Sequence, residues 1–326
     1  MITKRILILC AMFCLFSVQQ SSSKGLRGLL HYGDSMLMQR YKKSNIDTMY
    51  ITRPQTKWTL SGRINMSGAT LETEGQTVDG AFKSGIRADY KSTVSLGINY
   101  LGVSLALSVN PAKLMGKYDD IELNFSTYGN RYGIELMYQD ADSFTGWDEI
   151  EGQPRVQFST DDMSLKTWNV NAYYVFNHRR FSYPAAFTQG YIQRQSAGSF
   201  MLAVSGQGQR AEISNRDTNL KVINVGIGAG YGYNYVPARY WLLHLSALPT
   251  FIVYSSTSLS VENMRIPLHY NFPEVILTGR GAVIRQLGNM FVGATMTFYF
   301  TNIGDEHRLS IRNTKWLTRV IVGYRF

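Results

Sequence analysis

His244 and Ser246 are the two residues of this chain whose types and spacing come closest to catalysis. A serine nucleophile needs an adjacent base, and residues two positions apart on a β-strand point to the same face. The apolar residues of this stretch alternate with them, so both side chains would face away from the apolar side. The sequence shows no acid or amide at a comparable height to orient the imidazole. We therefore predict no enzyme, and a lipid-modifying hydrolase is the alternative.

Acidic residues gather in residues 140–166 and could hold a divalent cation through carboxylate oxygens. Their spacing matches no calcium motif, and the histidines show no zinc-ligand spacing. We predict a solvated loop here, with no metal and no cofactor in the protein. The carboxylates concerned are Asp140, Asp142, Asp148, Glu149, Glu151, Asp161 and Asp162.

A row of glycines occupies every second position of one stretch: Gly226, Gly228, Gly230 and Gly232. A spacing of two belongs to a strand and excludes a dinucleotide-binding loop. A glycine row in a strand marks the close approach of other backbone. Either it forms a recess into which another segment packs, or it accommodates the curvature of the sheet and bulky neighbours.

Residues 178–196 form a long segment that is basic, aromatic and rich in glutamine. We predict that it folds into or against a barrel, over the glycine row, as a partial plug. The alternative is a periplasmic hairpin that extends the flanking strands. The residues expected to face the lumen in the plug are Arg179, Arg180, Tyr183, Gln189 and Arg194.

The elements that carry these residues are predicted to be about twelve β-strands, because apolar and polar residues alternate with a period of two. Their connections also alternate between tight turns and longer loops, except for residues 178–196 after the sixth strand. Outer-membrane barrels have this arrangement of short periplasmic turns and long external loops. The tight turns lie at 101–102, 129–130, 236–239 and 287–288, and the longer loops at about 68–91, 111–118, 140–166, 210–219, 255–273 and 303–313.

Aromatic residues mark the tight-turn ends of these strands, as in the interfacial girdle of a membrane barrel. They are Trp58, Tyr100, Tyr132, Phe176, Tyr235, Trp241 and Phe326. The last strand ends in an apolar face with Val322, Tyr324 and Phe326, the signature by which the barrel-assembly machinery recognises its substrates. We predict an all-β, transmembrane, antiparallel barrel.

Composition and the N-terminus fit this prediction. Aromatic residues make up 13% and the mean hydropathy is only −0.15, as expected when polar lumen residues alternate with an apolar outer face. Cations are scattered despite a net charge of +10, so we expect no nucleic-acid partner. Lys4 and Arg5 precede a short apolar run, which indicates a cleaved signal peptide and export. Both cysteines, Cys10 and Cys14, lie in that run, which excludes disulfides in the exported chain.

The predicted organisation is a signal peptide (1–23), a short periplasmic segment (24–56) and an outer-membrane barrel (57–326). Several stretches resemble an uncharacterised family of Bacteroidota outer-membrane proteins, classed as a domain of unknown function. The resemblance covers about residues 30–326 and implies a barrel, but no activity, ligand or catalytic residue. The stretches that carry it are 45–54 with Trp58, 171–177, 180–187 with Gln189, 196–199 and 322–326.

We therefore expect a monomer in the bacterial outer membrane, in contact with lipid and lipopolysaccharide. The preferred function is a narrow or partly plugged pore of the transport type. Its polar lumen would carry Arg319, Arg325, Glu122 and Glu135. The alternative is a scaffolding barrel with a closed lumen that binds partner proteins or lipopolysaccharide. The solute or protein partner is not determined by the sequence.

Overall fold

The computed structural model describes residues 32–39, 45–77, 80–101, 103–109, 121–141, 144–152, 154–160, 163–213, 218–261, 264–266, 274–305 and 309–326. The chain divides into two compact units, Met1–Ser44 and Asn45–Phe326. The first contains a helix over residues 32–39, and the predicted signal peptide lies outside the described residues. No helix in the described ranges is long and apolar enough to cross a membrane.

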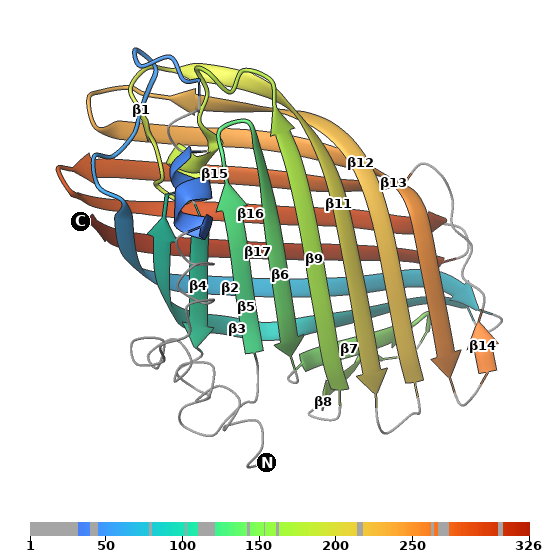
Figure 1. Ribbon diagram of the computed structural model, residues 1–326. Coiled ribbons are helices and arrows are strands. Elements are labelled where there is room, and N and C mark those ends of the chain that lie inside the picture. Colours follow the sequence, from blue (N-terminus) through green and yellow to red (C-terminus); the bar gives the residue numbers. More distant parts are fainter. Residues whose placement is uncertain are drawn as a thin grey trace. The chain divides into compact units, whose positions relative to one another are not determined.

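Twelve strands of the second unit form a closed antiparallel ring (Figure 1). Each pairs with the next in the chain, and the last returns to pair with the first, which closes the ring. The predicted antiparallel barrel of about twelve strands is confirmed. The ring consists of β2 (Trp58–Thr77), β3 (Gly80–Tyr100), β4 (Val103–Val109), β5 (Ile121–Tyr128), β6 (Tyr132–Ala141), β9 (Met163–Val175), β11 (Ala197–Ile213), β12 (Thr218–Tyr235), β13 (Trp241–Val261), β15 (Val275–Leu287), β16 (Met290–Asp305) and β17 (Leu309–Arg325).

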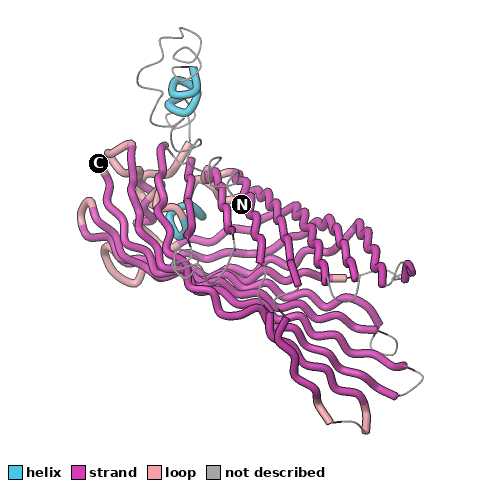
Figure 2. The backbone as a smooth tube through the Cα atoms, turned by 90° about the horizontal axis from the view of Figure 1, so that it is seen from below, coloured by secondary structure: helices cyan, strands magenta, loops and turns pink. Residues whose placement is uncertain are grey.

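The two faces of the ring differ as the sequence alternation predicts. On β3, Val94, Leu96 and Ile98 are exposed on the outside. Their neighbours Ser95 and Asn99 are buried on the inside. The outer face is therefore apolar and the lumen wall polar, the reverse of a soluble protein. The strands lie side by side along a curved wall, as the magenta tubes of Figure 2 show.

Tight turns join the strands at one end of the barrel, called here the tight-turn end. Gly288 has a φ of +66°, a left-handed conformation that glycine adopts without strain. The predicted girdle gathers at this end, and six of its aromatic side chains are exposed, whereas Tyr100 is half-buried. The exposed members are Trp58, Tyr132, Phe176, Tyr235, Trp241 and Phe326.

Several predicted loops at the opposite end are wrong, because the strands continue through them. β2 and β3 stay paired as far as Thr77 and Gly80, and β16 and β17 as far as Asp305 and Leu309. The backbone ladder persists there although apolar residues no longer alternate regularly, so the hydrophobic alternation used to place strand ends stops too early. The predicted acidic loop contains β7 (Phe144–Ile150) and β8 (Val156–Thr160), and β7 pairs with β3.

Two further short strands pair at the tight-turn end. β1 (Ile51–Thr52) pairs antiparallel with β10 (Ile192–Gln193), which joins residues before the barrel to the segment between β9 and β11. That segment also contains the short helix α4 (Tyr183–Phe187), which has Pro184 in its first turn. Proline suits this position because the first turn of a helix leaves its backbone N–H groups unpaired. A remaining strand, β14 (Met264–Ile266), pairs with β13.

We expect Leu96→Arg, on the outer face of β3, to lower the free energy of unfolding in lipid vesicles by about 2–4 kcal/mol, because the cation enters the apolar band. Thr70→Arg, on the outer face of the polar part of β2, is the control and should change it little. Urea titration followed by tryptophan fluorescence measures both. Equal effects would contradict an apolar band confined to the tight-turn half of the strands.

Candidate functional site

Residues 177–196, called here the plug segment, connect β9 to β11 at the tight-turn end, and their central part, 181–193, lies inside the barrel. Phe181, Ala185 and Ala186 are fully buried, and Tyr183 is 2% exposed. They pack against lumen-facing residues of β9, β11, β13 and β15. The structure therefore contradicts the alternative of a hairpin that extends the flanking strands.

Apolar residues on the lumen wall receive the plug segment. One cluster packs Phe181 and Tyr183 against Tyr173 and Met201, and the Tyr173 and Tyr183 ring centroids are 4.9 Å apart. A second packs the alanines of α4 against residues of β13 and β15. Burying each large apolar side chain contributes about 1.5–3 kcal/mol, so the plug segment adds substantially to the stability of the folded barrel.

Consecutive apolar residues in the sequence indicate this apolar wall. Leu242 and Leu243 are consecutive, as are Val283 and Ile284, so both faces of β13 and β15 are apolar near the tight turn. Leu242 and Ile284 are the inward members of these pairs and are buried. An apolar inner face in an otherwise polar lumen predicts that another part of the chain covers it.

The predicted plug arginines lie at the surface and hold residues 45–56, called here the strap. Arg180 forms an ion pair of 3.3 Å with Asp47, and its guanidinium lies 5.0 Å from the centre of the Tyr50 ring. Arg179 donates a hydrogen bond to Asn45, and the Arg194 backbone N–H donates one to the Tyr50 carbonyl. All three arginines are exposed, and the side chains of Arg179 and Arg180 contact the strap.

Asn234 on β12 joins the plug segment to the barrel wall. Its side-chain amide donates hydrogen bonds of 2.9 Å to the Ser182 carbonyl and to Gln193 Oε1. Its oxygen lies 2.7 Å from His244 Nδ1. The side chain is completely buried, so loss of these bonds would leave polar groups unpaired inside the barrel.

These hydrogen bonds also determine which ring nitrogen of His244 carries the proton. Because the Asn234 amide nitrogen donates to the plug segment, its oxygen accepts from His244 Nδ1–H. Nε2 is then the acceptor and lies 2.9 Å from Ser246 Oγ, whose hydroxyl donates to it. The orienting amide that the sequence did not reveal is therefore Asn234. It was missed because it is on a neighbouring strand, at a height that only the β12–β13 register sets.

Gln189 forms a second polar junction, between the plug segment and the last strand. It is 1% exposed, and its Oε1 accepts a hydrogen bond of 2.9 Å from Gln286 Nε2. Arg325 donates to Gln286 Oε1 at 2.7 Å and to the Gln189 carbonyl at 3.3 Å. The predicted lumen residue Arg325 thus anchors the plug segment to β17, in the same strand as Val322 and Tyr324.

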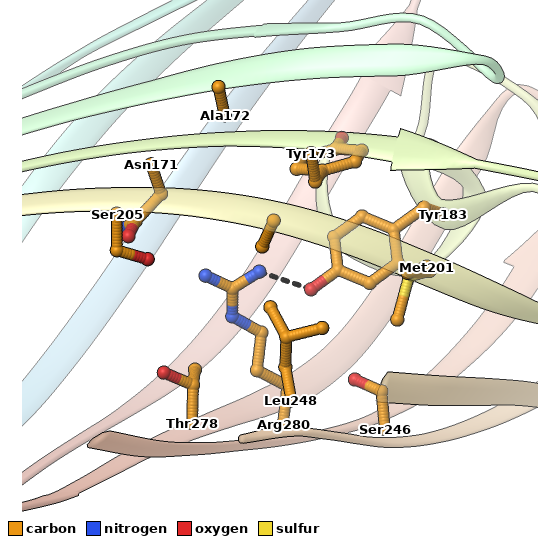
Figure 3. A pocket seen from close by; sticks show the side chains of 11 residues that line it. Asn171, Ala172, Tyr173, Tyr183, Met201, Ser205, Ser246, Leu248, Thr278 and Arg280 are labelled. Carbon is orange, nitrogen blue, oxygen red and sulfur yellow. Dashed lines mark hydrogen bonds between the residues drawn. The ribbon is translucent and has the colours of Figure 1, made fainter. Parts of the chain in front are cut away.

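Arg280 on β15 forms a third polar contact of the plug segment with the lumen wall. It donates hydrogen bonds to the Tyr183 hydroxyl and, at 2.7 Å, to Glu135 on β6. Burial raises the pKa of Tyr183 to about 12, although the Arg280 guanidinium beside it acts to lower it, so the phenol stays neutral. A small cavity beside these groups has room for little more than a water molecule. Figure 3 shows Ser205, Ser246 and Thr278 around it.

The glycines of the row Gly226–Gly232 have two different roles. One makes a recess for the plug segment, and the other three accommodate the neighbouring strand. A Cβ atom at Gly232 would lie 3.0 Å from Phe181 Cζ, so this glycine makes room for the plug segment. A Cβ atom at Gly228 or Gly230 would overlap the backbone of β13, and one at Gly226 would lie 2.7 Å from Thr250 Cγ2. Those three glycines therefore permit the close approach of β13, where the strand pairing is irregular.

Two further lumen charges were predicted, at Arg319 and Glu122. Arg319 is half-buried on the inner face of β17. The side chain of Glu122 lies outside what the structure describes. Among the described residues, no three His, Cys, Asp or Glu side chains gather closely enough to hold a metal ion.

A family model described as "Domain of unknown function (DUF4421)" matches residues 45–326. The chain belongs to this family. The matched region begins at the strap and includes the plug segment and all the strands of the ring, which is also the compact unit Asn45–Phe326. A search of curated proteins finds no match.

Solved outer-membrane proteins resemble the chain at low identity. The protease OmpT from Escherichia coli has a TM-score of 0.47 and 8% identity, covering 84% of this chain and 98% of its own. The translocator domain of the autotransporter NalP from Neisseria meningitidis has a TM-score of 0.34 and 12% identity, covering 92% and 98%. OprG from Pseudomonas aeruginosa has a TM-score of 0.26 and 12% identity, covering 82% and 96%. These likenesses add nothing about activity to what the strand pairing establishes.

We expect Asn234→Ala to loosen the plug segment and to lower the free energy of unfolding by about 3 kcal/mol, because it leaves buried polar groups unpaired. Chymotrypsin should then cleave after the buried aromatic residues Phe181 and Tyr191 faster than in the unsubstituted protein. The control is Asn224→Ala, which removes another buried lumen amide of β12 that bonds to Ser255. Equal cleavage in the two variants would show that Asn234 does not hold the plug segment.

Proposed function

We propose that the chain is an outer-membrane barrel of the narrow, transport type whose lumen is closed at the periplasmic end by its own plug segment. The observation that carries this proposal is the burial of residues 181–193 inside the ring, hydrogen-bonded to side chains of the wall. A ring of twelve strands is wider than the small barrels that side chains alone fill. An inserted segment therefore decides whether the lumen is open.

The membrane placement is supported by the apolar outer face and the girdle at the tight-turn end. Short turns face the periplasm in barrels of this kind, which puts the plug segment and the strap on the periplasmic side. We further propose a monomer that is assembled through its terminal strand with Val322, Tyr324 and Phe326. Lipopolysaccharide would contact the opposite end, where the strands continue beyond the apolar band.

Displacement of the plug segment would open its polar junctions and would also expose Phe181 and the α4 alanines, so it needs a bound partner. Each hydrogen bond between neutral groups contributes only about 0.5–1.5 kcal/mol net, since water can replace the partner. The two junctions at Asn234 and Gln286 can therefore open without breaking strand pairs of the ring. A solute or periplasmic partner that binds the displaced segment would supply the remaining free energy.

We expect the double substitution Asn234→Ala, Gln286→Ala to raise single-channel conductance in planar bilayers, whereas the unsubstituted protein gives little steady current. Both proteins must first show the shifted electrophoretic mobility of a folded barrel. Asn224→Ala is again the control and should conduct like the parent. If the double variant is folded, exposes its plug segment to chymotrypsin and still conducts nothing, the pore is excluded in favour of a scaffolding barrel.

A second candidate function, a serine hydrolase, is favoured by one observation, the hydrogen-bonded series Ser246–His244–Asn234. In such a series the base takes the serine proton as Oγ attacks, and the amide orients the base. Ser246 lines the cavity that also contains the Arg280 guanidinium, which could stabilise a developing oxyanion. The cavity admits no substrate while the plug segment is in place, so this activity would require its displacement.

We expect a fluorophosphonate to label Ser246 if this second function is correct. Ser246 Oγ forms a bond to phosphorus, fluoride leaves, and His244 takes the proton of the serine hydroxyl. Ser246→Ala should abolish labelling, and Asn234→Ala should alter its rate. Ser205→Ala, which removes another serine from the same cavity, should leave it unchanged. Intact-mass spectra that show no adduct on the plug-loosened Gln286→Ala variant would exclude the hydrolase.

A further inference from the structure

The outer wall of the barrel has an apolar hollow near the tight-turn end. It spans β12 to β17 and opens outward, away from the lumen. Its floor contains Gly281 and Ala294, and larger apolar residues surround them. The residues of its rim are Tyr233, Tyr235, Leu243, Leu245, Val283 and Met296.

Backbone packing does not require the small residue at the floor of this hollow. A Cβ atom at Gly281 would meet nothing closer than the His244 carbonyl oxygen at 3.8 Å, an ordinary contact, and its φ is not in the left-handed region. Gly228 and Gly230 differ, since a Cβ atom there would overlap the next strand. The absence of a side chain at Gly281 therefore shapes the outer surface and deepens the hollow.

Two arginines, Arg285 and Arg239, lie beside aromatic rings at the tight-turn end, where the girdle is. Arg285 lies two residues after Val283 on the same face of β15, about 7 Å further along the strand. Its guanidinium is 5.2 Å from the centre of the Trp241 ring, and Arg239 is 4.8 Å from that of Tyr240. Stacking on a ring holds a guanidinium in place and leaves its edge N–H groups for a phosphate.

The charged side chains around the tight-turn end are almost all positive. In the described segments 45–58, 129–131, 176–197, 235–241 and 285–290, the only acidic side chain is Asp47, which is paired with Arg180. The same segments contain Arg53, Lys57, Arg131, Arg179, Arg180, Arg194, Arg239 and Arg285. Such a surface attracts anionic headgroups by about 1 kcal/mol for each nearby cation.

We infer that the hollow and the two arginines form a binding site for one anionic glycerophospholipid of the periplasmic leaflet. Arg285 and Arg239 bind its headgroup phosphate, and one acyl chain lies in the hollow over Gly281. The site rests on the membrane placement proposed above and is independent of whether the plug segment moves.

The test is native mass spectrometry of the refolded full chain, released from micelles that contain equal amounts of phosphatidylglycerol and phosphatidylethanolamine with the same acyl chains. We expect one phosphatidylglycerol to be retained selectively. Arg285→Gln should reduce its retention about five-fold, the factor for one cation near an anionic headgroup. Gly281→Leu should reduce it by filling the hollow while all cations stay in place.

Two matched variants serve as controls. Arg131→Gln removes a similar arginine, 5.4 Å from the Tyr174 ring but away from the hollow. Gly62→Leu adds a side chain to the outer face of β2, where nothing lies within 4 Å of the new Cβ. Neither should change retention of the lipid.

Three results would overturn the site: equal retention of the two lipids, an equal loss with Arg131→Gln, or a dimer in which a second copy covers the hollow. Failure of the membrane placement would look different, because the protein would then not fold into phosphatidylcholine vesicles at all. A barrel that folds in those vesicles but does not select phosphatidylglycerol excludes only the lipid site.

Discussion

Pairing of β17 with β2 closes the strand ring, and the other features of the barrel depend on that closure. An apolar surrounding offers no hydrogen-bond partners, so each backbone N–H and C=O of a membrane-exposed strand has to pair with a neighbouring strand. Closure through the first and last strands leaves no free edge in the ring. It also makes the register between neighbours rigid, which determines where every lumen side chain lies.

Closure creates a lumen that the wall residues do not fill at the tight-turn end, and the chain fills it with residues 177–196. The polar and apolar parts of this contact have different consequences. Phe181, Tyr183 and the α4 alanines make the inserted position stable by removing apolar surface from water. Asn234, Gln286 and Arg325 select one orientation, because a hydrogen bond needs a partner at a defined distance and angle.

The buried amide of Asn234 contacts both the plug segment and the imidazole of His244. Asn234 bonds the plug segment through its nitrogen and His244 through its oxygen, so the position of the plug segment and the orientation of the imidazole are coupled. A displaced plug segment would give Asn234 freedom to rotate and would open the Ser246 side of the cavity. The pore and the hydrolase are therefore linked hypotheses that share one conformational step.

The strand pattern and the two faces of the barrel were determined by the sequence alone, because a period of two needs only local information. Residues 93–100 predict their own outward and inward faces, and the girdle aromatics predict the end with tight turns. The same local method failed beyond the apolar band, where strands such as β2 and β3 continue without a regular apolar alternation. There the backbone hydrogen bonds to a neighbouring strand, which one segment does not reveal, maintain the strand.

The tertiary structure decided which residues meet in the lumen. That residues 178–196 enter the barrel was predictable from their composition, but the contacts of Arg179 and Arg180 with the strap were not. Charge alone does not distinguish an arginine that lines a pore from one that holds the strap. The contact between Asn234 and His244, ten residues apart, depends on the register of β12 and β13, and the contact between Gln189 and Gln286 on closure of the ring. Registers and closure are properties of the whole barrel, so only the folded chain determines them.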